Sequence, residues 1–199
     1  MDVSQAVLLR EALAGSGLPE RADVFARALR RSTRSPGGLL LAGPAGDEPW
    51  HLTAHLDDEA RFSGRADLRP TLLRWNVHPG DPAHLRVSLD RLTEARRGES
   101  VLVVTERVDP SALDPLLERI DDARHRGAAV FAVEEQRTEL AGLATETLTM
   151  SDFTPGLASF DGIQHLTSLA IGRDDLAKER PGLRNRLGRL LDAWAGGPT

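Results

Sequence analysis

A chain of 199 residues, 40% hydrophobic and 28% charged, can bury one sizeable core, and this composition favours neither a disordered nor a fibrous protein. Its net charge of −5 would repel phosphate backbones, so we expect no nucleic-acid partner. The absence of cysteine excludes disulfides and thiolate chemistry, and no apolar run approaches the roughly 18 residues that cross a bilayer, so we expect no membrane partner and a cytoplasmic location.

The first part of the chain predicts two helices, a strand and a third helix. Apolar residues recur at helical spacing over Val3–Ala14 and Pro19–Arg31. The apolar run Leu39–Ala42 then predicts a short buried strand. A glycine turn, Gly43–Gly46, follows it, and Asp47 stands where the N-cap of the next helix would be.

The middle of the chain predicts a strand, helix, strand, helix and strand in turn. Leu72–Val77 is the first of these strands, and Leu85–Arg96 has helical spacing. Ser100–Thr105 is a β-branched apolar run of the kind that a parallel sheet buries on both faces, so it should be central. The helix Ser111–Arg126 and the strand Ala128–Val133 complete a βαβ unit.

The last part of the chain continues the alternation. It predicts a helix at Thr138–Ala144, a strand at Glu146–Met150 and helices at Phe160–Ile171 and Leu183–Ala195. The fold class is therefore α/β, a three-layer, doubly wound parallel sheet of about five strands, Rossmann-type, with N-terminal helices. We expect a single domain, 1–199, with N-terminal helices in 1–35, an α/β core in 36–172 and a C-terminal helix in 173–199.

Two loops follow predicted strands, where ligands of such sheets normally bind. In the first loop, Gly43 and Gly46 precede a helix N-terminus whose free N–H groups suit an anion. Asp47 and Glu48 would cap that helix while opposing a phosphate, so a purely structural turn fits the same residues.

The second loop follows the predicted central strand. Thr105, Arg107 and Ser111 can all contact an anion. Asp109 or Ser111 can equally be the cap of the next helix, with Pro110 near its first turn. The sequence leaves both interpretations open.

The histidines supply the remaining candidates. His51 and His55 are one helical turn apart, and His55 makes a second such pair with Glu59. Pairs of this spacing can bind a metal or transfer protons, although they also occur as solvated pairs or local ion pairs. Gln164 and His165 lie in a helix that follows the last predicted strand, so His165 could reach the same edge of the sheet.

Taken in order, these segments resemble the sugar isomerase (SIS) domain family, and within it the phosphoheptose isomerase branch. The resemblance covers roughly residues 20–172 and rests on LLLAGPAGD with HLDDEARF, on ESVLVVTERVDPS through FAVEE, and on FDGIQHLTSLAIG. The family has a glycine-rich first loop, a His-x-x-x-Glu helix, a phosphate loop after the central strand and a late helix that carries Gln and His. His55, Glu59 and Gln164 match this pattern, while the register of the family's catalytic histidine falls nearer Gly172.

The resemblance implies a protein that binds a phosphorylated sugar or a related metabolite. As a sugar-phosphate isomerase, it would use Glu59 as general base and His55 or His165 for the second proton. The alternative is a non-catalytic SIS-like sensor or assembly module. No cofactor is certain; a divalent metal with His55 and Glu59 among its ligands is the one the family implies, and the expected assembly is a homodimer or homotetramer.

Overall fold

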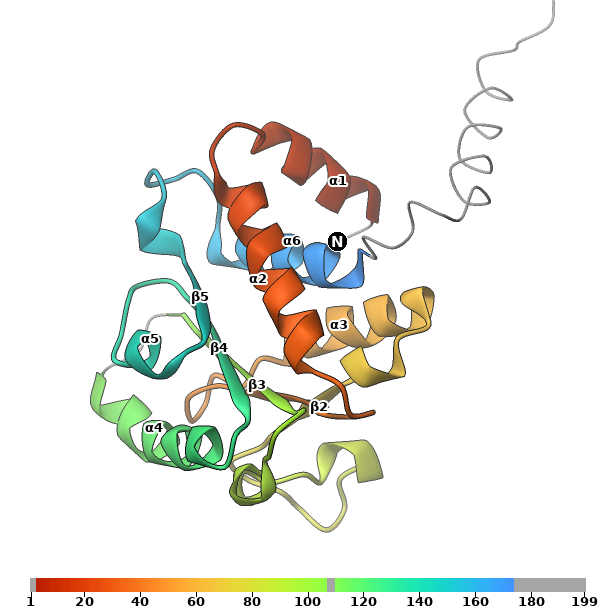
Figure 1. The fold of residues 1–199 in the computed structure, drawn as a ribbon, viewed down its shortest axis with the longest axis vertical. Coiled ribbons are helices and arrows are strands. Elements are labelled where there is room, and N and C mark those ends of the chain that lie inside the picture. Colours follow the sequence, from red (N-terminus) through yellow and green to blue (C-terminus); the bar gives the residue numbers. More distant parts are fainter. Residues whose placement is uncertain (1–2, 107–109, 174–199) are drawn as a thin grey trace, which may run out of the picture.

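The computed structural model describes residues 3–106 and 110–173, and side chains from residue 8 to 106 and from 112 to 173. Its centre is a five-stranded, all-parallel sheet in the order β2-β1-β3-β4-β5 (Figure 1). This confirms the predicted α/β fold and the central place of the strand at 100–105. The strands are β1 Leu39–Ala42, β2 Pro70–Leu72, β3 Ser100–Thr105, β4 Ala129–Glu134 and β5 Glu146–Thr149.

Helices cover both faces of the sheet (Figure 1). On one face, α2, α3 and α6 pack over Leu39 and Leu41 of β1, and α1 lies against α6. On the other face, α4, α5 and a 3-10 turn pack over Leu40 and Ala42. The alternation follows from the strand geometry, because successive side chains point to opposite faces. The helices are α1 Val3–Ala12, α2 Leu18–Ser32, α3 Trp50–Ser63, α4 Pro110–His125, α5 Leu140–Leu143 and α6 Phe160–Gly172.

The strand after α3 is shorter and earlier than the sequence predicts. It ends at Leu72, which pairs with Leu41, while Ala42, the last residue of β1, pairs only with β3. Beyond one further bond from Leu73 N–H to the Leu41 carbonyl, the chain turns away, and the Arg74 N–H donates to the Val87 carbonyl. The predicted strand at 72–77 is therefore wrong over most of its length.

The predicted helix at 85–96 is also wrong in kind. The chain there forms two 3-10 turns, Ala83–Leu85 and Leu89–Glu94. Ser88 interrupts any continuous helix, because it forms a bridge with Arg74 and its side chain accepts a hydrogen bond from the Asp90 N–H. The other predicted helices and strands within the described residues agree to within two residues at each end, while 183–195 lies outside the described residues.

Within the described ranges, no helix is both long and apolar enough to cross a bilayer.

Candidate functional site

The sheet has its topological switch point between β1 and β3, because the chain winds outward in one direction through β2 and in the other through β4 and β5. The glycine turn follows β1 and Glu106 follows β3, so the two candidate loops start from neighbouring strands. A Cβ atom on Gly43 would lie 3.2 Å from the Val104 carbonyl oxygen. Fold and register therefore bring the starts of both loops to the position where open α/β sheets bind ligands.

Gly43 is required by the turn itself. It is buried, and a Cβ atom there would lie 2.3 Å from the Asp47 carbonyl oxygen. The Trp75 indole N–H donates to the Gly43 carbonyl at 2.9 Å, which ties the turn to the segment after β2. Gly46 has φ +85°, the left-handed region that favours glycine, and is exposed.

The predicted N-cap at Asp47 is wrong. Asp47 is exposed, its N–H donates to the Pro44 carbonyl within the turn, and α3 begins at Trp50 with Pro49 in the N-cap position. No side chain caps α3. Pro49 stands directly before the helix with φ −79° and ψ 59°.

Glu48 is held away from the helix start. Its carboxylate accepts the Trp75 N–H at 2.9 Å and pairs with Arg74 at 3.3 Å, both side chains being largely buried. Arg74 also pairs with Asp81 and lies over the Trp50 ring, 4.7 Å from its centroid. The negative charge of Glu48 is therefore neutralised by Arg74 instead of facing a ligand at the loop.

Three polar side chains end neighbouring strands in register, and we call them the strand-end row: Thr105 of β3, Glu134 of β4 and Thr149 of β5. All three are buried, on the face of the sheet that carries α4 and α5. Thr105 Oγ1, Glu134 Oε1 and Thr149 Oγ1 have no hydrogen-bond partner within the described part of the chain. Buried polar atoms are nearly always paired, so such atoms at a sheet's carboxyl edge mark a place for a ligand or water.

Only one of the two carboxylate oxygens of Glu134 has a hydrogen-bond partner within the described part of the chain. Its Oε2 accepts the Thr138 backbone N–H at 3.0 Å and the Thr138 hydroxyl at 2.5 Å. Burial raises the pKa of Glu134, and the two bonds from Thr138 oppose the rise. Sequence reasoning does not single out Glu134 or Thr149. The available signal was a polar residue within one position of the end of each predicted strand, at positions that pair only once the register is known.

Two more residues were predicted to contact an anion in the second loop, which follows β3. One of them, Arg107, lies outside the described residues. Residue 111, a serine, is placed only by its backbone in the first turn of α4.

The candidate histidines converge from two helices. His51 and His55 lie in the first two turns of α3, His165 lies in the second turn of α6, and the two helices pack together. We call these three residues the histidine cluster. Their ring centroids are 4.4 to 4.7 Å apart in pairs, and His51 Nε2 is 2.9 Å from His55 Nε2.

One carboxylate holds two members of the histidine cluster. Asp161 Oδ1 lies 2.7 Å from His51 Nδ1, and its Oδ2 lies 3.3 Å from His165 Nε2. His165 is 4% exposed. Burial lowers the pKa of His55, helped by His165 and His51, and burial also lowers the pKa of His165 against the opposing pull of Asp161.

The remaining predicted catalytic residues lie beside the histidine cluster and not in it. The Glu59 carboxylate lies against Gly172, where a Cβ atom would be 2.1 Å from Glu59 Oε2. Burial raises the pKa of Glu59, and Asp58 adds to the rise. Gln164 is half-buried next to His165, and adjacent helix positions face different directions.

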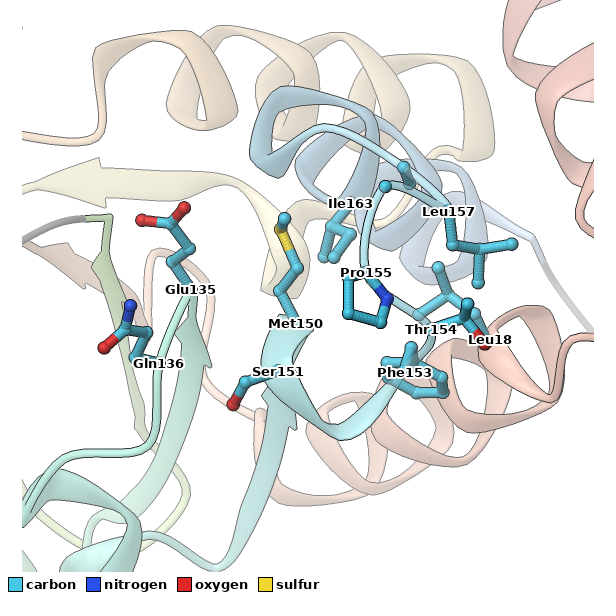
Figure 2. Close-up of a pocket in the computed structure, with 12 residues that line it drawn as sticks. Leu18, Glu135, Gln136, Met150, Ser151, Phe153, Thr154, Pro155, Leu157 and Ile163 are labelled. Carbon is cyan, nitrogen blue, oxygen red and sulfur yellow. The ribbon is translucent and has the colours of Figure 1, made fainter.

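A cavity of about 250 Å³ lies at the ends of β4 and β5 (Figure 2). Figure 2 shows Met150, Pro155 and Ile163 around it, with Glu135 and Gln136 on the segment after β4. The lining is mostly apolar and belongs to the face of α2 and α6. The cavity, at the ends of β4 and β5, is therefore separate from the switch point between β1 and β3.

Comparisons with known proteins place the fold. No family model and no curated protein matches the sequence. A proposed sugar-binding protein from Salmonella typhimurium LT2 superposes with a TM-score of 0.52 at 15% identity, over 94% of this chain and 51% of that one, so this chain spans about half its length. The NanR protein of Vibrio vulnificus, solved with ManNAc-6P, gives a TM-score of 0.47 at 14% identity, over 96% and 70% of the two chains. The first likeness supports the α/β fold alone.

Proposed function

We propose that this chain is a SIS-like protein that binds a sugar, in particular a phosphorylated sugar or a related metabolite, at the β1/β3 switch point. The observation that carries the proposal is the Thr105 hydroxyl, which is buried at the switch point with no partner within the described part of the chain. The sequence resemblance to the SIS domain and the sugar-binding description of the Salmonella protein with a similar fold support it.

The chemistry of the strand-end row suits a polyol. Sugar hydroxyls both donate and accept hydrogen bonds, so they can pair with threonine hydroxyls and with a carboxyl group in either protonation state. An unpaired buried polar group costs about 1–3 kcal/mol, which a ligand hydroxyl would recover. A phosphate would bind at the N-terminus of α3, because no side chain caps this helix. The acidic residue nearby, Glu48, is paired with Arg74.

Binding without isomerisation is the form of the function that we propose. Aldose–ketose isomerisation needs a carboxylate and an imidazole around two adjacent carbons. By the sequence resemblance, the register of the family's catalytic histidine falls nearer Gly172, and Glu59 lies directly against that glycine. This supports a non-catalytic sensor as the specific form of the proposal.

The test is thermal unfolding and calorimetry of the full chain with fructose and sedoheptulose phosphates and with the unphosphorylated sugars. A ligand at 100 times its Kd adds about 2.7 kcal/mol to the stability of the folded state. Thr105→Val should weaken binding about five-fold by removing one hydrogen bond. Thr33→Val is the matched control, because Thr33 is equally buried but bonds to Ser100 at the opposite end of β3.

Absence of any shift, or equal affinity of wild type and Thr105→Val, would contradict the proposed site. The same samples are assayed for interconversion of the aldose and ketose forms, and binding without turnover is expected. Turnover that Glu59→Gln abolishes would instead establish the isomerase.

A further inference from the structure

The histidine cluster has the donor set of a metal site. Three imidazoles each offer one ring nitrogen, and these three atoms lie within 4.8 Å of one another. Two of them come from one helix at i and i+4, the spacing with which helices present paired histidine ligands. The third comes from a different helix, so a bound cation would join α3 to α6.

A carboxylate already contacts two of these three histidines. The Asp161 carboxylate lies 2.7 Å from His51 Nδ1, which leaves His51 Nε2 directed at His55, 2.9 Å away. Asp161 also contacts His165 at 3.3 Å. A carboxylate on the far nitrogen of a histidine fixes its tautomer and ring orientation, the usual support for a metal-bound imidazole.

We propose that His51, His55 and His165 bind a divalent cation of the zinc type through three imidazoles and leave a fourth position open. Zinc–nitrogen bonds are about 2.0–2.1 Å long, so tetrahedral geometry needs nitrogens roughly 3.4 Å apart. Side-chain rotation has to bring the three nitrogens, which lie within 4.8 Å of one another, to that spacing. Three protein ligands with an open position are typical of sites where the metal takes water or a ligand oxygen.

This ligand set differs from the pair implied by the sequence resemblance, His55 with Glu59. Glu59 lies against Gly172 and is not among the clustered groups. The proposal needs no sugar and stands independently of the proposed function, so either can fail without the other.

The experiment is isothermal titration of the metal-free, untagged full chain with Zn²⁺, and with Co²⁺, whose visible absorption reports tetrahedral coordination. We expect one saturable site for both ions and none for Mg²⁺, which prefers oxygen ligands. His51→Gln changes an exposed side chain and should weaken Zn²⁺ binding at least ten-fold and abolish the cobalt bands. Asp161→Asn should weaken binding about ten-fold, as does loss of a carboxylate that hydrogen-bonds to a metal-bound histidine.

The matched control is His84→Gln, since His84 is exposed and outside the cluster. It should bind both ions like the wild type. The proposal is overturned if the wild type shows no saturable Zn²⁺ site, or if His51→Gln and His84→Gln bind with the same affinity. His165→Gln, at a buried position, is used only if its circular dichroism matches the wild type, and it should then lose the site as well.

Discussion

The histidine cluster and the strand-end row lie near the same edge of one sheet, yet they hold their polar groups in opposite ways. The imidazoles of the cluster contact one another and share Asp161, on the face of α3 and α6. In the strand-end row, Thr105 and Thr149 have hydroxyls without partners among the described residues, on the face of α4 and α5. The first arrangement is the one for which we propose a cation, and the second leaves hydrogen-bonding capacity for a ligand or water.

The largest expected change in stability comes from a substitution in the glycine turn after β1, beside the strand-end row. Gly43→Ala should lower the free energy of unfolding by about 3 kcal/mol, because its Cβ meets backbone that cannot move aside. Urea denaturation measures the change. Gly142→Ala is the control, since a Cβ there meets nothing within 4 Å and should be neutral or stabilising by up to about 1 kcal/mol. A loss below about 1 kcal/mol at Gly43 would show that the turn adapts.

On the cluster side, Gly172→Ala should cost about 2 kcal/mol, because the new Cβ overlaps the Glu59 side chain. Glu59→Ala should relieve part of that cost, since it removes the carboxylate and leaves only its Cβ close by. A double-mutant cycle measures the coupling between the two positions. Purely additive effects would mean that Glu59 is free to swing away from Gly172.

Two buried threonines compare a partnered hydroxyl with an unpartnered one. Thr33→Val should lose about 1 kcal/mol, because Thr33 donates to the Leu29 carbonyl and bonds to Ser100. Thr105→Val, without added ligand, should be neutral or slightly stabilising, because it removes a buried hydroxyl with no described partner. Equal losses in urea denaturation would indicate that Thr105 has an internal partner after all.

The smallest effect is a pH dependence at Glu134. Burial raises its pKa, so above the ordinary glutamate value the folded chain keeps a proton that the unfolded chain has lost. The stability it contributes is therefore present at low pH and falls as pH rises through the raised pKa. Glu134→Gln should flatten that fall, which begins above about pH 4, the ordinary glutamate range. The exposed Glu118→Gln should leave the profile unchanged, and an unchanged profile in Glu134→Gln would contradict the raised pKa.

The sequence predicted secondary structure correctly where a short run of residues carries the signal by itself. The runs at 39–42 and 100–105 predict buried strands because β-branched and aliphatic residues without charges suit only the interior of a parallel sheet. The predictions at 72–77 and 85–96 failed because pairing between distant segments of the chain determines the structure there. β2 stops at Leu72, where the chain leaves β1 and Arg74 bridges to Ser88, and the same bridge breaks the helical pattern around Ser88.

The glycine turn, the histidine pair on one helix, and Thr105 at a strand end were all visible in the sequence, because spacing and order along the chain specify them. Tertiary structure alone decided what surrounds them. Packing of α3 on α6 brought His165 to His51 and His55, and the parallel register set Thr105 beside Glu134 and Glu134 beside Thr149. The physical reason is that contacts between residues far apart in the chain depend on helix packing and strand register, which no local pattern contains.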